Sequence, residues 1–272
     1  MTAKLTLPRR NADKHRLYEL AVQDVEFEVE FAFAQYERRR GRPPRILRED
    51  FCGSALMACR WVEEHPKCRA IALELDPEVL RWARTHNVEP LGPAAHRVDL
   101  RQANVQSVTR PKADVIQAFN FSYYLFDTFP ALIEYFRCVR RSLAPGGIVM
   151  VDTYGGWESQ RKFEERRTVR SPAGTFEYIW EQVDFNPIDN RALGHIHFGF
   201  KDGKRLDKAF TFEWRMYSPA EVSDALEAAG FADVEVLWDQ AKSDDYSDFR
   251  PALRAENTPG WWAYVIAERP PR

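Results

Sequence analysis

Cysteine is scarce in this chain, and net charge is nearly absent. The four cysteines, spread over 272 residues, have no Cys-x-x-Cys spacing and no regular pairing. A disulfide framework and a thiolate zinc site are therefore not expected, and we interpret the cysteines as reduced thiols of a cytoplasmic protein. The formal net charge of −2 argues against electrostatically driven binding to nucleic acid or to a membrane surface.

Long hydrophobic runs are also missing. No apolar stretch approaches the roughly 20 residues of a membrane-spanning helix, so a membrane protein is not expected. The N-terminus, MTAKLTLPRRNADKHR, is basic but lacks the apolar core of a signal peptide. The hydrophobic content of 44% is enough for a substantial core, and the length favours one large α/β domain, with or without an insertion.

The most informative segment is RILREDFCGSALMA, from Arg45 to Ala58. An apolar opening leads to the acids Glu49 and Asp50, a turn of small residues follows, and a helix begins at Leu56. This order is typical of an open α/β sheet that presents backbone amides to a nucleotide-like ligand. The turn must be small because such a ligand approaches the backbone itself.

A second predicted strand, AIALELDP, ends in another acid, Glu74, which Leu75 follows. An acid at the tip of the second strand is placed to accept hydrogen bonds from both hydroxyls of a ribose. Asp76 and Pro77 then supply an N-cap and a proline at the first helical position.

These two strand ends resemble the S-adenosylmethionine (SAM) site of class I methyltransferases, whose first motif commonly runs acid-x-Gly-x-Gly-x-Gly. When Gly53 is aligned with the second glycine of this motif, Glu49 takes the place of the acid. Phe51 and Ala55 then replace the first and third glycines. A dehydrogenase-type motif needs glycines to admit a pyrophosphate, which disfavours a nicotinamide-dependent oxidoreductase. SAM has no phosphate, so one glycine with small neighbours is enough.

The resemblance extends to later strand ends. In the family an acid after the third strand accepts from the adenine amine, and Asn104 holds that position here. Asn120-Phe121-Ser122-Tyr123 keeps the Asn-x-x-Tyr spacing of the Asn-Pro-Pro-Tyr motif of amino-methyltransferases, without its prolines. The resemblance implies SAM as the cofactor, no metal, Asn120 and Tyr123 as the residues at the methyl acceptor, and a cofactor-binding set of Glu49, Phe51, Cys52, Gly53, Ser54, Glu74, Leu75, Asn104, Val105, Asn120 and Tyr18.

Strands and helices alternate along most of the chain, which predicts a doubly wound, Rossmann-like α/β sheet with an antiparallel C-terminal hairpin. After Gly156 the pattern changes to alternating runs, which predict three antiparallel strands as an inserted β lid. Residues 13–40 are expected to be helical, with a solvated arginine run at their end. The expected division is an N-terminal helical cap (1–44), a SAM-binding methyltransferase domain (45–156 and 217–272) and the inserted lid (157–216).

The motifs LREDFCGSA, YIWEQVDFNP and RMYSPAEVSDALEAAGF also resemble uncharacterised bacterial methyltransferases of small-molecule type. We therefore expect methyl transfer from SAM to nitrogen or oxygen of a small molecule. The alternatives are a non-catalytic SAM-binding or interaction module, and a methyltransferase that acts on protein or RNA. The aromatic strands of the insert could also form a homodimer interface.

Three polar residues are ambiguous in the sequence. His195 and His197 lie two apart, hence on one face of a strand, but have no nearby third ligand for a metal. We interpret them as a plain strand face or a pocket wall. Arg48 is expected to pair with an acid of the sheet rather than with the carboxylate of SAM.

Overall fold

The computed structural model describes residues 4–241 and 248–271. The chain divides into two compact units. One comprises Met1–Gln23, Gly155–Met216 and Asn257–Trp261, and the larger one comprises Asp24–Tyr154, Tyr217–Glu256 and Trp262–Arg272. The predicted N-terminal segment, residues 1–44, is thus divided between the two units. Within the described residues, no helix has the length and apolar character needed to cross a membrane.

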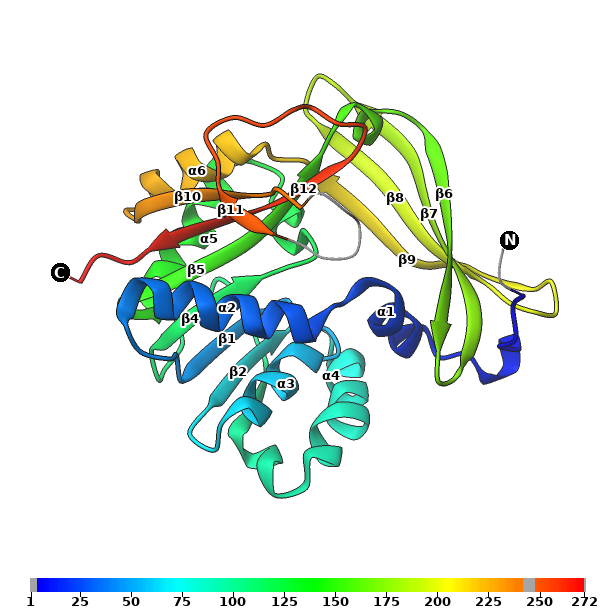
Figure 1. The fold of residues 1–272 in the computed structure, drawn as a ribbon, viewed down its shortest axis with the longest axis horizontal. Coiled ribbons are helices and arrows are strands. Elements are labelled where there is room, and N and C mark those ends of the chain that lie inside the picture. Colours follow the sequence, from blue (N-terminus) through cyan, green and yellow to red (C-terminus); the bar gives the residue numbers. More distant parts are fainter. Residues whose placement is uncertain (1–3, 242–247, 272) are drawn as a thin grey trace. The chain divides into compact units, whose positions relative to one another are not determined.

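The larger unit is built on an eight-stranded sheet in the order β11-β10-β12-β5-β4-β1-β2-β3 (Figure 1). Strands β1 to β5 pair in parallel, and β10 pairs antiparallel with both β11 and β12. This order confirms the predicted doubly wound sheet, whose direction of winding reverses between β1 and β4. The strands are β1 (Ile46–Asp50), β2 (Arg69–Glu74), β3 (Val98–Gln102), β4 (Ala113–Ala118), β5 (Leu143–Gly155), β10 (Ala232–Asp239), β11 (Phe249–Pro251) and β12 (Trp261–Glu268).

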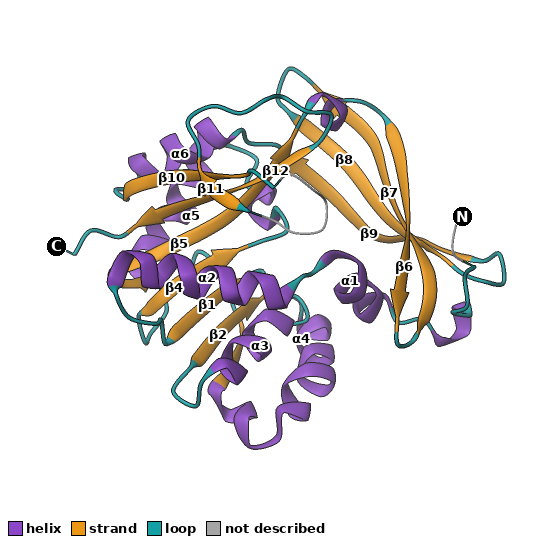
Figure 2. Cartoon of the chain, viewed as in Figure 1, coloured by secondary structure: helices purple, strands orange, loops and turns teal. Residues whose placement is uncertain are grey.

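Helices cover both faces of this sheet (Figure 2). Helices α2 (Val25–Arg40) and α3 (Leu56–Glu64) share one hydrophobic core with β1, β4, β5 and β12, whereas α5 (Phe129–Ser142) and α6 (Pro219–Ala228) lie together on the opposite face. Val29, Ala32 and Tyr36 of α2 are buried at helical spacing, which confirms a helix rather than a strand for VEFEVEFAF. Helix α4 (Pro77–Ala83) begins at the predicted N-cap, where the Asp76 side chain accepts from the Glu78 amide.

The smaller unit is a four-stranded antiparallel sheet in the order β6-β7-β8-β9. The sequence predicted three of these strands and missed β6, because the charged run FEERRTVRS shows no alternation of apolar and polar residues. Leu17 and Ala21 of α1 (Lys14–Val22) join a core with Phe176 and Phe198. The strands are β6 (Phe163–Ser171), β7 (Gly174–Asn186), β8 (Arg191–Gly199) and β9 (Arg205–Arg215).

The arginine run at the end of α2 is not the solvated helix end that the sequence suggested. The Arg39 side chain is 6% exposed, and its Nε lies 3.2 Å from Oε1 of Glu268 in β12. Arg38 and Arg39 both form ion pairs with Glu235 of β10. The expectation was wrong because the carboxylates that neutralise this run lie near the other end of the chain, where no local pattern reveals them.

Candidate functional site

The turn after β1 holds three residues in the left-handed backbone conformation: Phe51 (φ 55°), Gly53 (φ 51°) and Ala55 (φ 54°). The Cys52 amide donates to the Leu73 carbonyl of β2 at 2.9 Å, which ties the turn to the neighbouring strand. Among the described residues other than its chain neighbours, none has an atom within 4 Å of the position that a Cβ on Gly53 would take. The turn therefore leaves open space at Gly53, at the carboxyl edge of the sheet, where such folds bind ligands.

Glu74, at the end of β2, joins the two predicted cofactor motifs. Its Oε2 accepts from the Gly53 amide at 3.2 Å, and its Oε1 accepts from the amides of Leu75 (2.7 Å) and Asp76 (3.0 Å). A carboxylate offers about four lone-pair sites. Glu74 can therefore hold the turn in place and still accept hydrogen bonds from a ribose.

Glu49, Cys52 and Ser54 support the turn from inside. Glu49 is buried, and its Oε2 accepts from the Ala58 amide of α3 at 2.9 Å. Burial raises the pKa of the Glu49 carboxyl well above its ordinary value. Burial also raises the pKa of the Cys52 thiol, so this group stays protonated and is not a nucleophile. The Ser54 carbonyl accepts from the Asn87 side chain at 2.9 Å.

A second strained turn follows β4. Asn120 (φ 56°) and Phe121 (φ 58°) are consecutive residues in the left-handed backbone conformation, which is uncommon for residues other than glycine. The carboxylate of Asp152 in β5 accepts from both of their amides, at 2.8 Å and 2.9 Å. Asp152 is 3% exposed, and burial raises its pKa to about 7. Sequence reasoning missed this residue, although its place at the carboxyl end of a strand was a signal.

The predicted adenine contacts follow β3, and Leu75 of the predicted cofactor set follows β2. Asn104 is exposed, and its Oδ1 accepts from the Gln106 amide at 2.8 Å, so the side chain shapes its own loop. Val105 is buried, whereas Leu75 is 60% exposed directly beside Glu74. These positions fit a loop that can contact a flat aromatic ring, and their role in binding stays a prediction.

Residues 52–149 match the model of the family described as a methyltransferase domain. The matched segment runs from the turn after β1 into β5. Its fold is similar to that of DesVI from Streptomyces venezuelae, with 18% identity, coverage of 94% of this chain and 98% of that chain, and a TM-score of 0.69. No curated protein matches the sequence of the chain.

Two further solved structures share the class I methyltransferase fold. The first is SAM-bound CalS10, an amino pentose methyltransferase from Micromonospora echinaspora, with 15% identity, coverage of 99% and 100% of the two chains, and a TM-score of 0.66. The second is the sugar N-methyltransferase KedS8 from Streptoalloteichus, with 17% identity, coverage of 99% and 98%, and a TM-score of 0.66.

Two tyrosines of the predicted site pack against other aromatic side chains. Tyr123 is completely buried, and its ring centroid lies 5.0 Å from that of Tyr124. Tyr18 belongs to the smaller unit, where its ring packs at 5.0 Å from Phe210 of β9. A contact of either residue with the cofactor or the acceptor stays a prediction.

Arg48 has the structural role that the sequence suggested. Its side chain is fully buried, and its Nε lies 2.6 Å from Oδ1 of Asp50. The same guanidinium donates to the Ser142 hydroxyl at 2.8 Å and to the Val105 carbonyl. Arg48 thus links β1 to α5 and to the loop after β3, and its hydrogen-bonding capacity serves the interior of the methyltransferase domain.

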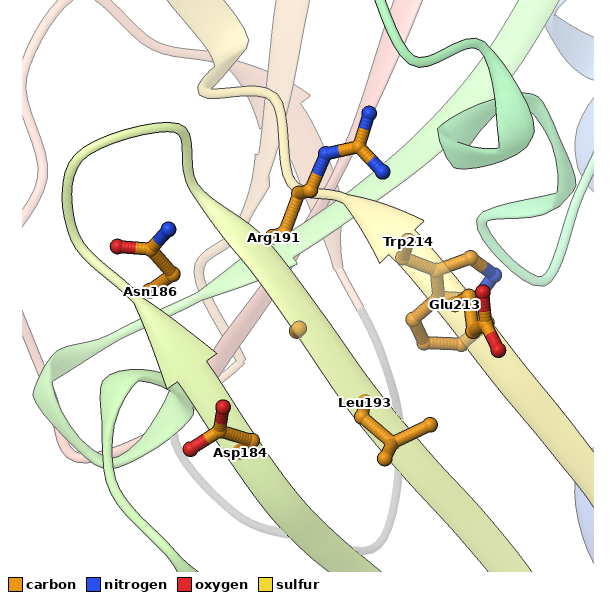
Figure 3. A pocket seen from close by; sticks show the side chains of 7 residues that line it. Asp184, Asn186, Arg191, Leu193, Glu213 and Trp214 are labelled. Atoms are coloured by element: carbon orange, nitrogen blue, oxygen red, sulfur yellow. The ribbon is translucent and has the colours of Figure 1, made fainter.

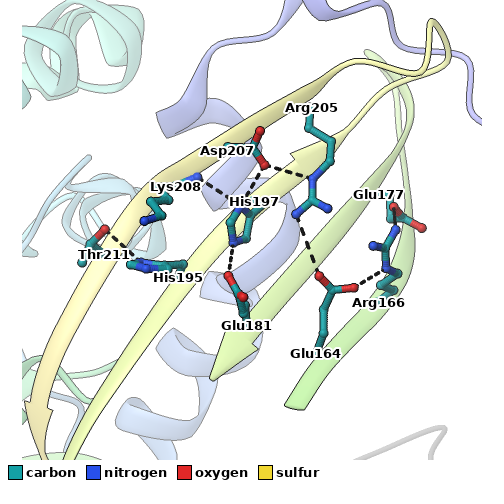
Figure 4. Close-up of polar contacts among 10 residues, drawn as sticks. All are labelled: Glu164, Arg166, Glu177, Glu181, His195, His197, Arg205, Asp207, Lys208 and Thr211. Atoms are coloured by element: carbon teal, nitrogen blue, oxygen red, sulfur yellow. Dashed lines mark hydrogen bonds and ion pairs between the residues drawn. The ribbon is translucent and has the colours of Figure 1, made fainter. Parts of the chain in front are cut away.

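His195 and His197 line one face of β8 in the smaller unit (Figure 4). His197 Nδ1 accepts from the Lys208 amide at 3.1 Å, while its Nε2 lies 3.0 Å from Glu181. His197 Nδ1 also lies 3.2 Å from Oδ1 of Asp207, so a carboxylate contacts each nitrogen of the ring. His195 contacts the Thr211 hydroxyl at 3.1 Å, and burial lowers its pKa. Both rings thus serve a hydrogen-bonded strand face.

A hollow lies at the ends of β7, β8 and β9 (Figure 3). Its wall combines carboxylates, an arginine and the Trp214 indole. No residue of the predicted cofactor set lines it. The lining residues are Asp184, Asn186, Arg191, Ala192, Leu193, Glu213 and Trp214.

Proposed function

We propose that this protein transfers the methyl group of SAM to a nitrogen or oxygen atom of a small molecule. The observation that carries the proposal is the hydrogen bond between the Gly53 amide and Glu74, which joins both cofactor motifs at the carboxyl edge of the sheet. The open space at Gly53 supports a ligand that approaches the backbone there. SAM is the cofactor that fits, because the turn lacks the glycines that a pyrophosphate requires.

In this proposal the residues of the site bind and orient the cofactor and the acceptor, and none of them forms a covalent bond with either molecule. SAM, when bound, supplies a methyl group that its sulfonium already activates. In this proposal Glu74 and the Gly53 turn hold the nucleoside part of the cofactor, and the Asn120–Phe121 turn positions the Asn120 side chain. Methyl transfer then depends on aligning the acceptor atom with the methyl carbon and the sulfur, and on excluding water.

The small-molecule acceptor is supported by the kinds of enzymes that share the fold over their full length, which act on an amino pentose and on a sugar nitrogen. The near-neutral charge of the chain gives no support to an RNA acceptor. A non-catalytic SAM-binding module is the second candidate, because fold alone does not establish activity. Release of S-adenosylhomocysteine in the presence of an acceptor separates the two.

Glu74→Ala is expected to weaken SAM binding by about 1.5–3 kcal/mol, since hydrogen bonds to a charged group are lost. Calorimetric titration with SAM measures the effect. Glu78→Ala is the matched control, because Glu78 lies four residues further on and pairs only with the exposed Arg81 among the described residues. Unchanged SAM affinity in folded Glu74→Ala protein would remove Glu74 from the cofactor site.

We also propose that the smaller unit is needed for transfer to the acceptor and not for SAM binding. Because β6 pairs with β7 along its length and α1 shares their core, a clean deletion removes residues 1–23 and replaces 163–215 by a Gly/Ser linker. The shortened protein lacks Tyr18 but keeps the Gly53 turn and Glu74, so it should still bind SAM, more weakly, and lose methyl transfer. Normal transfer rates would refute this role, and a change from dimer to monomer with activity retained would favour the interface interpretation.

A further inference from the structure

A cluster of polar side chains lies on the face of the sheet that α2 covers. Residues of β1, β4, β5 and β12 that point to this face belong to one hydrophobic core with α2. Because side chains alternate along a strand, the polar residues two positions beyond those core residues point the same way. The cluster consists of Glu49, Gln117 and Asp152 near the carboxyl ends of β1, β4 and β5, Tyr264 of β12, and Glu28 of α2.

Ring contacts and charges place Tyr264 and Glu28 together. The Tyr264 ring lies 4.7 Å from Phe31 of α2 and 5.2 Å from Phe119, which precedes the strained turn. Burial raises the pKa of the Tyr264 hydroxyl, and the nearby carboxyls of Glu28 and Asp152 raise it further. Asp152 likewise acts on the Glu28 carboxyl, whose pKa burial raises to about 8. Asp24, the N-cap of α2, also acts on the Glu28 carboxyl, and Glu28 in turn acts on Glu49.

Three of these groups lack partners among the described residues. The Tyr264 hydroxyl is fully buried without a hydrogen bond, and so is Oε1 of Gln117. Glu28 is 5% exposed, and its carboxylate accepts no hydrogen bond and forms no ion pair in the described parts of the chain. Glu49 and Asp152, by contrast, accept from backbone amides. The cluster therefore has an excess of acceptors. Because buried charges are normally paired, the Glu28 carboxyl, with its pKa of about 8, stays largely protonated near neutral pH until a cation pairs with it.

We propose that Glu28, Gln117 and Tyr264 form a subsite for one ammonium group, whose positive charge pairs with the Glu28 carboxylate. An ammonium group supplies a positive charge and several donors in a small volume, which matches acceptors arriving from α2, β4 and β12. The inference rests on the proposed function, because the ammonium belongs to a molecule bound at the carboxyl edge of the sheet. The source is either the methionine end of the cofactor or an amine that accepts the methyl group.

The first experiment compares S-adenosylhomocysteine, which carries an ammonium, with 5′-methylthioadenosine, which does not. Calorimetric titrations use the full chain and its variants Glu28→Gln and Tyr264→Phe, with Glu30→Gln as the control on the exposed side of the same helix. If the cofactor supplies the ammonium, Glu28→Gln weakens S-adenosylhomocysteine at least tenfold and leaves 5′-methylthioadenosine unchanged. Tyr264→Phe, which removes only an unpartnered hydroxyl, should fold normally and weaken the same ligand.

The second experiment titrates n-butylammonium chloride, with n-butanol as the neutral control, into protein saturated with S-adenosylhomocysteine. If the acceptor supplies the ammonium, this complex binds n-butylammonium and not n-butanol, and Glu28→Gln weakens that binding at least tenfold. If Glu28→Gln and Tyr264→Phe bind both S-adenosylhomocysteine and n-butylammonium with wild-type affinity, the proposed subsite is wrong. If neither nucleoside binds, the proposed function fails, and n-butylammonium titrated into the unliganded protein still decides whether the subsite exists.

Discussion

Gly53→Val is expected to abolish SAM binding while the far-UV circular dichroism of the protein stays native. Gly53 has φ 51°, a conformation that β-branched residues avoid at a cost of roughly 1–3 kcal/mol. A Cβ at this position meets no protein atom within 4 Å, so a valine side chain would project into open space rather than into the core. In the proposed site that space belongs to the cofactor, and calorimetry with SAM measures the loss.

Gly203→Val is the matched control for this prediction. Gly203, in the turn between β8 and β9, has φ 72° and also has no atom within 4 Å of an added Cβ. The control therefore carries similar backbone strain without touching the turn after β1, and it should lower stability while SAM affinity persists. Wild-type affinity in Gly53→Val, or equal loss in both variants, would contradict the assignment of the turn.

Local sequence patterns were sufficient for most of the larger unit. Each predicted strand of the parallel sheet appears, because an apolar run followed by turn residues and a capped helix is a local signal. The capping box at Ser218 and Glu221 shows the same principle, since both of its hydrogen bonds join residues three apart. Strand β6 was missed because its stability comes from pairing with β7 and not from its own pattern.

The candidate site shows the limit of local patterns more clearly. Glu49, Gly53 and Glu74 could be predicted, because each stands at a strand end within a recognisable motif. Asp152 and Glu28 could not, because their roles depend on which strands and helices become neighbours in the folded chain. Glu28 lies in a run where acids alternate with apolar residues, and such alternation is typical of a strand whose acids face solvent.

Asp152→Asn is expected to lower the rate of methyl transfer by about 100-fold while SAM affinity changes little. The carboxylate holds the amides of Asn120 and Phe121, and an asparagine has only one side-chain oxygen for two donors. Displacement of the turn by about 1 Å would misplace the Asn120 side chain, which is enough for a loss of that size. The measurement is the kcat of methyl transfer, determined separately from the dissociation constant of SAM.

The pH profile tests the same prediction independently. Asp152 must be ionised to accept from both amides, and its pKa of about 7 means that the holding interaction strengthens as the pH rises through this value. The kcat of the wild-type protein should therefore fall as the pH is lowered through about 7, and the kcat of Asp152→Asn should not show this fall.

Asp114→Asn is the matched control, because the buried Asp114 accepts from the amides of Arg45 (2.8 Å) and Ile46 (3.0 Å) at the opposite edge of the sheet. Asp114→Asn should lower the stability of the protein, leave kcat unchanged and keep the fall of kcat below about pH 7. Equal losses of kcat in the two variants would mean that Asp152 only stabilises the fold.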